Sequence, residues 1–388
     1  MKGRLLVGFC LSLSFLGSLA AQAPGEIKLG CILNLDGPDA QVAKVTQSAL
    51  EDHVKEVNAK GGTKGRKIRL IIYSDKDTPA DAQASATHLM EKDHVAGIVG
   101  PEWSLAAMRL GPVSESNKVP VIASAASYPW VTVDFTGSPR PYMFRACFTD
   151  PAQVAALTDY AFHELGMRRA AILFNYESIN GMDDVRGFET EFNRLGGKVV
   201  ARESYRLGAT SDFRPQLARI AAAKPDCLLF PPTHYLQDIT RLASQAKALG
   251  FKCQFLGFDN WAVHSLLTLA GKDIDGAVFT TGLSIEDPQF ADFNARFLKA
   301  HGTQCEASTY YALDAIMALE HAAKLSLEKT GKISPVAMKG ALENMKDVPV
   351  FTGKMTMDPK THTPRNKPVL VVAIKDGKWK TVKTYQPE

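Results

Sequence analysis

The sequence contains few cysteines, and their spacing excludes two classes of protein. There are six among 388 residues, and one of them, Cys10, falls in an apolar N-terminal stretch. The other five match no zinc-ligand spacing and are too sparse for a disulfide scaffold. Two of these, Cys227 and Cys253, open successive expected strands. A disulfide between them and a pair of buried free thiols therefore both stay open.

Long runs of charge and long apolar runs are also missing. The formal net charge is only +4, and no stretch interleaves basic with aromatic residues. A nucleic acid is therefore disfavoured as a partner. Beyond the first twenty residues, no segment is apolar enough over a sufficient length to cross a membrane.

The motifs of common hydrolases and nucleotide-binding proteins are absent as well. There is no G-x-S-x-G sequence, which disfavours an α/β-hydrolase. The glycine-rich residues 61–66 (GGTKGR) follow an expected helix and precede an expected strand, the reverse of the order in a phosphate-binding loop. We interpret them as a surface turn. We expect no catalytic residues, no metal and no cofactor.

The first twenty residues have the pattern of a secretory signal peptide. Lys2 and Arg4 provide the positive start, and residues 5–16 form an apolar core that is too short to span a bilayer. Residues 18–20 (SLA) form a small-x-small cleavage site. We therefore expect residues 1–20 to be removed and the mature protein to be periplasmic.

Strand and helix patterns alternate along nearly all of the remaining chain. Residues 26–33 and 198–205 are expected strands, and residues 104–117 and 183–195 are expected amphipathic helices. This alternation is typical of an α/β fold with parallel, doubly wound sheets. The chain is too long for one compact core, so we expect two domains.

Five of the expected strands end in short polar segments. These segments are PEWS (101–104), SAAS (124–127), NYES (175–178), THY (233–235) and DNW (259–261). Ligands of parallel α/β sheets bind at the carboxyl ends of strands, where loops and helix N-termini meet. The segments contain hydroxyls, aromatic rings and carboxylates but no nucleophile beside a base. They therefore indicate ligand capture without chemistry on the ligand.

Changes in pattern predict where the chain crosses between two Rossmann-like lobes. Residues 139–150 are extended and rich in proline, residues 276–282 form an isolated β-like run, and a third change falls near 349–353. Several crossings imply a hinge that can close on a ligand. The predicted lobes consist of residues 21–145 with 276–350 and residues 146–275 with 351–388.

The order of several loose motifs resembles a known family. They include VNAKGGTKGRKIRL, VAGIVGPEWS, VPVIASAAS, MFRACFTDPAQ, SQAKALGFKCQFLGFDNW and YYALDAIMAL. Together they are similar to the periplasmic binding proteins of ABC importers in the branched-chain amino acid (leucine/isoleucine/valine) group. The resemblance implies a type I periplasmic-binding-protein fold with two lobes, a three-segment hinge and a ligand in the cleft. It also implies a membrane permease as partner, and we expect a monomer.

The resemblance also assigns roles to residues at the strand ends. Ser104 and the segment containing Ala125 and Ser127 match positions that hold a ligand carboxylate. Hydroxyls and backbone N–H groups at a helix N-terminus favour an anion, although Ser104 is also a suitable N-cap. Asp259 matches the acidic residue that binds an ammonium group, and Tyr176 with Thr233 would complete the second lobe's contribution.

The chain departs from the family pattern at some binding positions. Val42 and Ile179 replace two tyrosines. Trp103 and Tyr128 add bulk beside the carboxylate site. Five aromatic residues could line an apolar pocket or pack in the core: Trp103, Tyr128, Tyr176, Phe258 and Trp261.

We therefore hypothesise a solute-binding protein that captures a small amino acid, branched-chain or otherwise apolar, and delivers it to a permease. The alternatives are a ligand-sensing module of the same fold and a protein that binds a carboxylate or amide without an amino group. An exported enzyme is a third, weaker hypothesis.

Overall fold

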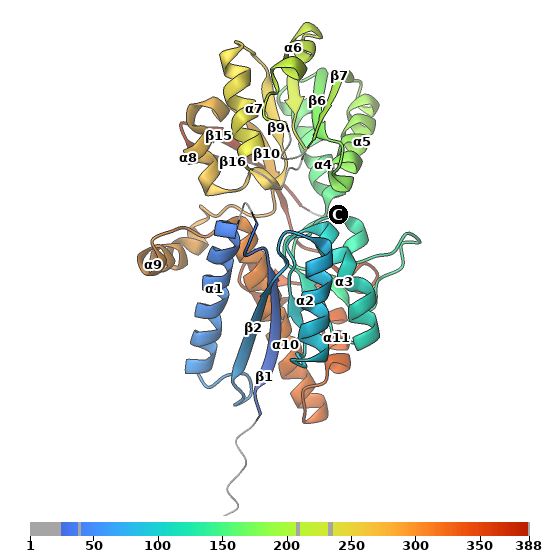
Figure 1. Ribbon diagram of the computed structural model, residues 1–388, viewed down its shortest axis with the longest axis vertical. Coiled ribbons are helices and arrows are strands. Elements are labelled where there is room, and N and C mark those ends of the chain that lie inside the picture. The colour runs from blue at the N-terminus through green and yellow to red at the C-terminus, as the bar shows by residue number, and fades with distance from the viewer. Residues whose placement is uncertain (1–24, 38–39, 207–209, 232–235, 387–388) are drawn as a thin grey trace, which may run out of the picture.

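The computed structural model describes residues 25–37, 40–206, 210–231 and 236–386, which form two α/β lobes one above the other (Figure 1). Each lobe is built on a sheet that is largely parallel and has helices packed against it. The predicted fold class is confirmed.

The first lobe contains a five-stranded parallel sheet. Its strands in spatial order are β2 (Ile68–Ser74), β1 (Ile27–Leu33), β3 (Ile98–Val99), β4 (Val121–Ala123) and β5 (Met143–Arg145). Parallel strands that are covered on both faces read as continuous apolar runs. β1 follows this rule, since six of its seven residues are buried. The carboxyl ends of β1, β3 and β4 point toward the second lobe (Figure 1).

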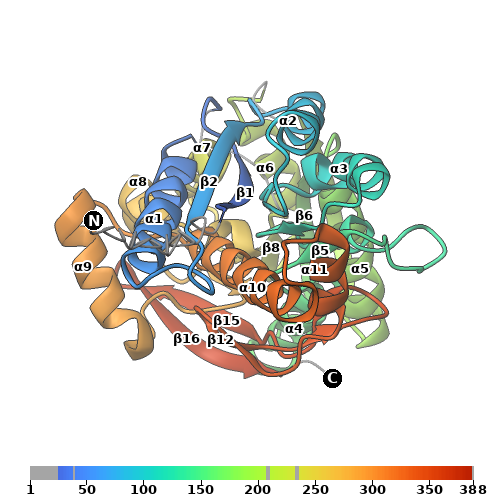
Figure 2. The same cartoon turned by 90° about the horizontal axis from the view of Figure 1, so that it is seen from below.

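Six described helices belong to this lobe. They are α1 (Ala40–Ala59), α2 (Pro79–Glu91), α3 (Ser104–Asn117), α9 (Ala291–His301), α10 (Ala307–Thr330) and α11 (Pro335–Glu343). The side chain of Thr78 caps α2 by accepting the backbone N–H of Asp81 at 3.0 Å. Seen from below, α10 crosses the lobe with α1 on one side and α11 on the other (Figure 2). This position brings the start of α10 close to the interlobe region.

The second lobe contains a seven-stranded sheet. Its strands in spatial order are β16 (Lys378–Tyr385), β15 (Val369–Lys375), β10 (Val278–Thr281), β9 (Gln254–Gly257), β8 (Cys227–Leu229), β6 (Arg169–Asn175) and β7 (Lys198–Tyr205). β15 and β16 are antiparallel and turn at Asp376 and Gly377, which both have positive φ. This combination suits a two-residue hairpin. The larger helices are α4 (Asp150–Asp159), α5 (Ile179–Arg194), α6 (Arg214–Ala222), α7 (Leu236–Ala248) and α8 (His264–Ala270).

Three connections join the lobes, as the resemblance implied. The first runs from β5 to α4, the second follows β10 and leads to α9 (Ala291–His301), and the third precedes β15. Two connections differ in position from the sequence-based boundaries at 276 and 350. β10 pairs with β9 and β15 in the second sheet. The hairpins β11–β12 (Val348–Val350, Gly353–Met355) and β13–β14 (Met357–Asp358, Thr363–Pro364) lie against helices of the first lobe.

Short strands explain the difference in boundaries. A four-residue apolar run such as 278–281 fits either lobe by pattern, and only its pairing partner assigns it. In β10, Val278 and Phe279 pair with Leu256 and Gly257 in parallel and with residues of β15 in antiparallel orientation. Tertiary pairing therefore decided the lobe to which this strand belongs.

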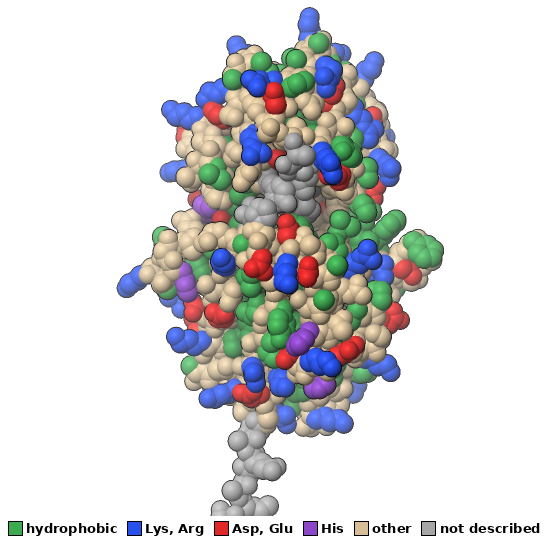
Figure 3. All heavy atoms as spheres, viewed as in Figure 1, with side chains coloured by type: hydrophobic (Ala, Val, Ile, Leu, Met, Phe, Trp, Pro, Cys, Tyr) green, Lys and Arg blue, Asp and Glu red, His purple; other side chains and the backbone are tan. Residues whose placement is uncertain are grey.

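Surface charge is mixed on the face in view (Figure 3), and the described cysteines are unpaired. On the face in Figure 3, basic and acidic side chains are interspersed, without a large patch of one sign. Cys227 and Cys253 are free thiols, as are the other three described cysteines. None of the described helices has the length and apolar character needed to span a membrane.

Candidate ligand-binding site

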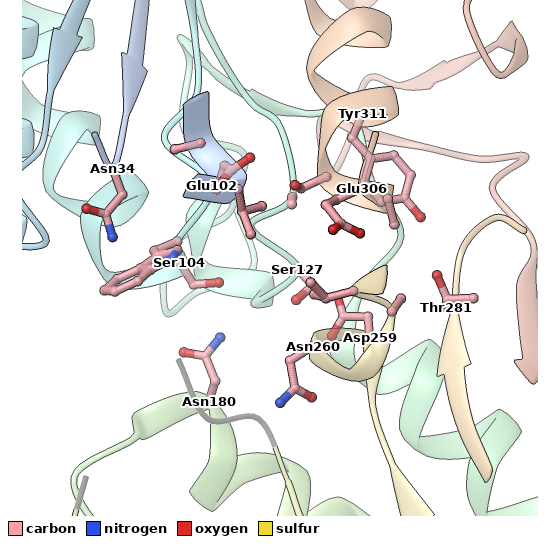
Figure 4. Close-up of a pocket in the computed structure, with 18 of the residues that line it drawn as sticks. Asn34, Glu102, Ser104, Ser127, Asn180, Asp259, Asn260, Thr281, Glu306 and Tyr311 are labelled. Atoms are coloured by element: carbon pink, nitrogen blue, oxygen red, sulfur yellow. The ribbon is translucent and has the colours of Figure 1, made fainter. Parts of the chain in front are cut away.

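A cavity of about 210 Å³ lies between the lobes, at the carboxyl ends of the strands. It is far larger than the space needed for one water molecule, so it can hold a small organic ligand. Its wall combines residues of both lobes (Figure 4). The lining residues are Asn34, Val42, Ala43, Glu102, Trp103, Ser104, Ala125, Ser127, Asp150, Asn180, Leu236, Asp259, Asn260, Ala262, Val263, Thr281, Glu306, Ala307, Ser308 and Tyr311.

Hydroxyl groups of the first lobe line one part of the wall. Ser104 is the first residue of α3, and its Oγ accepts the backbone N–H of Tyr128 at 3.2 Å. Ser127 lies on the segment after β4, and its hydroxyl bonds the carboxylate of Asp150. Both serines are 7% exposed. The N-terminus of α3 and the adjacent loop are suited to an anionic group of a ligand.

Gln153 holds two carboxylates of the second lobe in place. Asp259 lies in a 3₁₀ turn after β9, and Asp150 lies in the first turn of α4. The Gln153 amide donates to Asp150 Oδ1 at 3.0 Å and to Asp259 Oδ1 at 3.4 Å. Its Oε1 accepts the backbone N–H of Asp259 at 3.2 Å. These contacts give the two carboxylates fixed positions, as a binding site requires.

Burial and like charge raise the pKa values of these carboxyl groups. The pKa of Asp259 rises to about 7, because the group is buried and because Asp150 lies nearby. Burial also raises the pKa of Asp150, although Ser127 and Arg145 oppose the rise. The pKa of Asp184 is raised by burial and by Asp150 and Asp259. A positively charged group of a ligand in the cavity would compensate the negative charge of these carboxylates.

Two more carboxyl groups line the first-lobe side of the cavity. Burial raises the pKa of Glu102 to about 7, and Ser308 and Thr46 partly oppose the rise. Burial also raises the pKa of Glu306 to about 7, although hydrogen bonds from the backbone N–H groups of His264 and Ser265 lower it in part. The described residues contain no group of carboxylates, histidines and cysteines arranged to hold a metal ion.

Besides the contact between Ser127 and Asp150, two hydrogen bonds connect the lobes at the sides of the cavity. The Tyr128 hydroxyl donates to Asp183 Oδ2 at 2.5 Å, on α5. The backbone N–H of His264, at the start of α8, donates to Glu306 Oε2 at 2.7 Å. α5 and α8 lie on opposite sides of the second lobe (Figure 1). The lobes are therefore held together on both sides of the cavity.

The structure brings five of the residues predicted from the sequence to one cavity: Trp103, Ser104, Ala125, Ser127 and Asp259. Tyr176 is not among the residues that line it, and its side chain is 49% exposed. Tyr128 is buried and lies against α5, where it contributes to a neighbouring cavity with Trp130, Asp183 and Asp184. Thr233 lies outside the described residues.

The aromatic lining expected from the sequence is also different. Phe258 and Trp261 are 0% and 1% exposed and pack in the core, and neither lines the cavity. Val42 does line it, at the position where the family pattern has a tyrosine. Ile179 starts α5, is 39% exposed and lies outside the wall.

Sequence reasoning assigned no role to several polar lining residues. Glu102 belongs to the polar segment 101–104, and Asp150 is the last residue of the predicted crossing segment 139–150. The position of Asp150 in the first helical turn after a predicted connection between the lobes could have indicated a binding role. Glu306 and Tyr311 had no local signal, because only the packing of α10 brings them to the cavity.

Comparison with known proteins agrees with this architecture. Residues 26–378 match the periplasmic binding protein family. The chain belongs to this family. It is therefore a solute-binding protein of the ABC-transporter type.

Curated relatives and solved structures extend the similarity over most of the chain. The chain is 25% identical to the Leu/Ile/Val-binding protein of Escherichia coli K12, over 72% of this chain and 73% of that protein. It is 26% identical to the Leu/Ile/Val-binding protein BraC3 of Rhizobium johnstonii, over 87% and 89%.

Two solved binding proteins with different ligands share the fold. The isoleucine-bound protein of Streptococcus pneumoniae has a TM-score of 0.83 at 21% identity, over 93% of this chain and all of that one. A Rhodopseudomonas palustris protein in complex with 3,4-dihydroxybenzoic acid has a TM-score of 0.79 at 23% identity, over 93% and 97%. The fold therefore does not select the ligand.

The raised carboxyl pKa values predict how stability depends on pH. A folded state that holds protons more tightly than the unfolded chain loses stability as these protons leave. For Asp259 this contribution is complete below about pH 4 and is lost as the pH rises through about 7. We expect Asp259→Asn to gain stability over the unliganded wild type by at most about 1.4 kcal/mol per pH unit between pH 5 and 7.

Urea denaturation at several pH values measures this difference. Asp292→Asn, at an exposed position on α9, is the matched control and should show no trend. A stability difference for Asp259→Asn that does not change with pH would contradict the raised pKa.

Proposed function

We propose that this periplasmic binding protein captures a small amino acid in the interlobe cavity and delivers it to an ABC-type permease. The observation that carries the proposal is the pairing of two opposite sites in one cavity. Ser104, Ala125 and Ser127 suit a carboxylate, and Asp259 with Asp150 suits an ammonium group. The expected affinity is micromolar or tighter, about 8 kcal/mol or more.

The proposal includes export of the protein and closure of its lobes on the ligand. Residues 1–20 direct the chain to the periplasm and are removed, and the mature monomer closes its lobes on the ligand. The names of the curated relatives support an amino acid as ligand. The names of these relatives favour a ligand with a branched-chain or another apolar side chain.

A thermal-shift screen of the mature protein from Ala21 onward tests the proposal. Amino acids should raise the melting temperature at saturation, because a ligand that binds only the folded state stabilises it by mass action. Their deaminated carboxylates should not, since they lack the group for Asp259. A shift with plain carboxylates, such as benzoates, would retain the transport role and overturn the amino acid assignment.

Closure of the lobes gives a second test. Tyr128→Phe removes the interlobe hydrogen bond to Asp183, and bonds to charged groups contribute about 1.5–3 kcal/mol. We expect a smaller closed population and, as a result, an apparent affinity weakened by up to about 100-fold. Small-angle scattering with and without ligand measures the closure.

Tyr385→Phe is the matched control for this experiment. The Tyr385 hydroxyl donates to Asp159 Oδ2 at 2.5 Å, and both residues belong to the second lobe. This variant should lower stability without changing the affinity or the closure. Equal affinities of the Tyr128→Phe variant and the wild type would contradict a role for Tyr128 in closure.

A further inference from the structure

The first-lobe wall of the cavity contains two carboxyl groups that an apolar amino acid would leave without a positively charged partner. Glu102 and Glu306 lie on one side of the cavity, and Asn180, Asp259 and Asn260 lie on the other (Figure 4). Among the described residues that line the cavity, four are carboxylates and none is lysine, arginine or histidine. A zwitterion brings only one positive charge to these four groups.

Glu102 is the residue of this wall that most needs a ligand. It follows β3 directly, and its Oε1 is buried without a hydrogen-bond partner among the described residues. The hydroxyl of Ser308, on α10, interacts with the Glu102 carboxylate, and its buried Oγ has no other partner among the described residues. Since a buried polar atom without a partner is destabilising, a ligand with N–H donors would stabilise the Glu102 side chain.

The neighbouring basic groups do not neutralise this wall. The buried guanidinium of Arg145 donates to the carbonyl oxygens of Ala126, Tyr128 and Pro129, and to Thr132 Oγ1. His264 Nδ1 lies 3.9 Å from Glu306 Oε2, but burial lowers the pKa of this histidine. No basic side chain of the described cavity wall therefore compensates Glu102 and Glu306, and a cationic group of a ligand would stabilise their charged forms.

We propose that the ligand is an amino acid with a second positively charged group on its side chain, an ammonium or a guanidinium, and that Glu102 binds this group. Ser308 accepts a second N–H of the same group, and Glu306 supplies a further negative charge from the start of α10. This inference rests on the proposed amino acid function and replaces the apolar side chain expected from the sequence. Glu102 is then a specificity-determining residue.

Calorimetric titration of the mature protein with L-lysine and L-norleucine tests the inference without any substitution. The two amino acids share a six-carbon chain, and only lysine carries the terminal ammonium. We expect lysine, ornithine or arginine to bind at least about tenfold more tightly than norleucine or leucine. L-glutamine, which has N–H donors but no charge, should bind more weakly than the best cationic ligand.

The Glu102→Gln variant locates the interaction. It should weaken binding of the cationic amino acid by roughly 10- to 100-fold and leave norleucine binding nearly unchanged. Glu115→Gln, exposed at the far end of α3, is the matched control. Ser308→Ala is a second variant with a smaller expected loss, and it keeps the test valid if Glu102→Gln folds poorly.

The outcomes separate the two proposals. Norleucine or leucine binding as tightly as the cationic amino acids would overturn this inference and leave the amino acid function intact. Tighter binding of glutamine would overturn the requirement for charge. If the cationic ligands bind with equal affinity to Glu102→Gln and wild type, the role of Glu102 is overturned. If no amino acid binds, both proposals fall.

Discussion

Replacing Asp259 with asparagine is expected to weaken the binding of amino acids by about 1.5–3 kcal/mol, or roughly 10- to 150-fold. The carboxylate lies buried in the cavity beside Asp150 and is held by Gln153. A hydrogen bond between an ammonium group and a carboxylate is strengthened where water is excluded. Asparagine keeps the shape of the side chain but removes the charge.

Binding and stability should change in opposite directions in this variant. Asp259 costs stability in the unliganded protein above about pH 4, because burial and Asp150 disfavour its charge. Asp259→Asn should therefore melt at a higher temperature without ligand and show a smaller shift with ligand. Calorimetric titration and thermal melting of the same samples measure both effects.

Asp292→Asn serves as the control in this experiment too, since the residue is exposed on α9. A deaminated analogue of the ligand lacks the ammonium group and should produce no larger thermal shift with the wild type than with the Asp259→Asn variant. An unchanged affinity for amino acids would remove Asp259 as the partner of that group.

Replacing Lys367 with methionine is expected to lower the free energy of unfolding by about 3–5 kcal/mol. Lys367 lies just before β15 on the third connection between the lobes, and it forms a buried ion pair with Asp314 of α10. The two residues are 6% and 0% exposed. The Lys367 ammonium also donates to Thr352 Oγ1 at 2.6 Å. Methionine keeps the apolar stem but leaves the Asp314 carboxylate buried without its counter-charge.

Urea denaturation measures this loss. Lys346→Met, at an exposed position, should change stability little. The double variant Lys367→Met with Asp314→Leu should recover much of the loss, because apolar replacement of both partners of a buried pair is often neutral. A single Lys367→Met variant as stable as the wild type would show that the ion pair contributes nothing to folding.

Local patterns in the sequence predicted much of the fold. The predicted helix at 104–117 and strand at 198–205 coincide with α3 and β7. The helix predicted at 183–195 begins earlier, at Ile179. The side chain of Ser178 accepts the backbone N–H of Gly181 at 3.0 Å and caps the helix there. The N-cap signal was present in the sequence and outweighs the weak apolar pattern of the first turn.

The candidate site was predictable only where it lies at a strand end or helix start. Ser104 and Asp259 stand directly after apolar strands, and this position is visible in any α/β sequence. Tyr176 stands at such a strand end as well, but it does not line the cavity and is half exposed. Position along a strand does not determine the direction of a side chain in the following loop.

The sequence by itself determined the α/β class, the strand ends that face the cavity and the absence of recognisable catalytic motifs. Only the tertiary structure decided which lobe contains β10 and which carboxylates share the cavity. Glu102, Asp150, Asp259 and Glu306 are separated by long stretches of chain. Their proximity and burial arise from packing between lobes. Since burial and neighbouring charge set their pKa values, the electrostatic character of the site exists only in the folded protein.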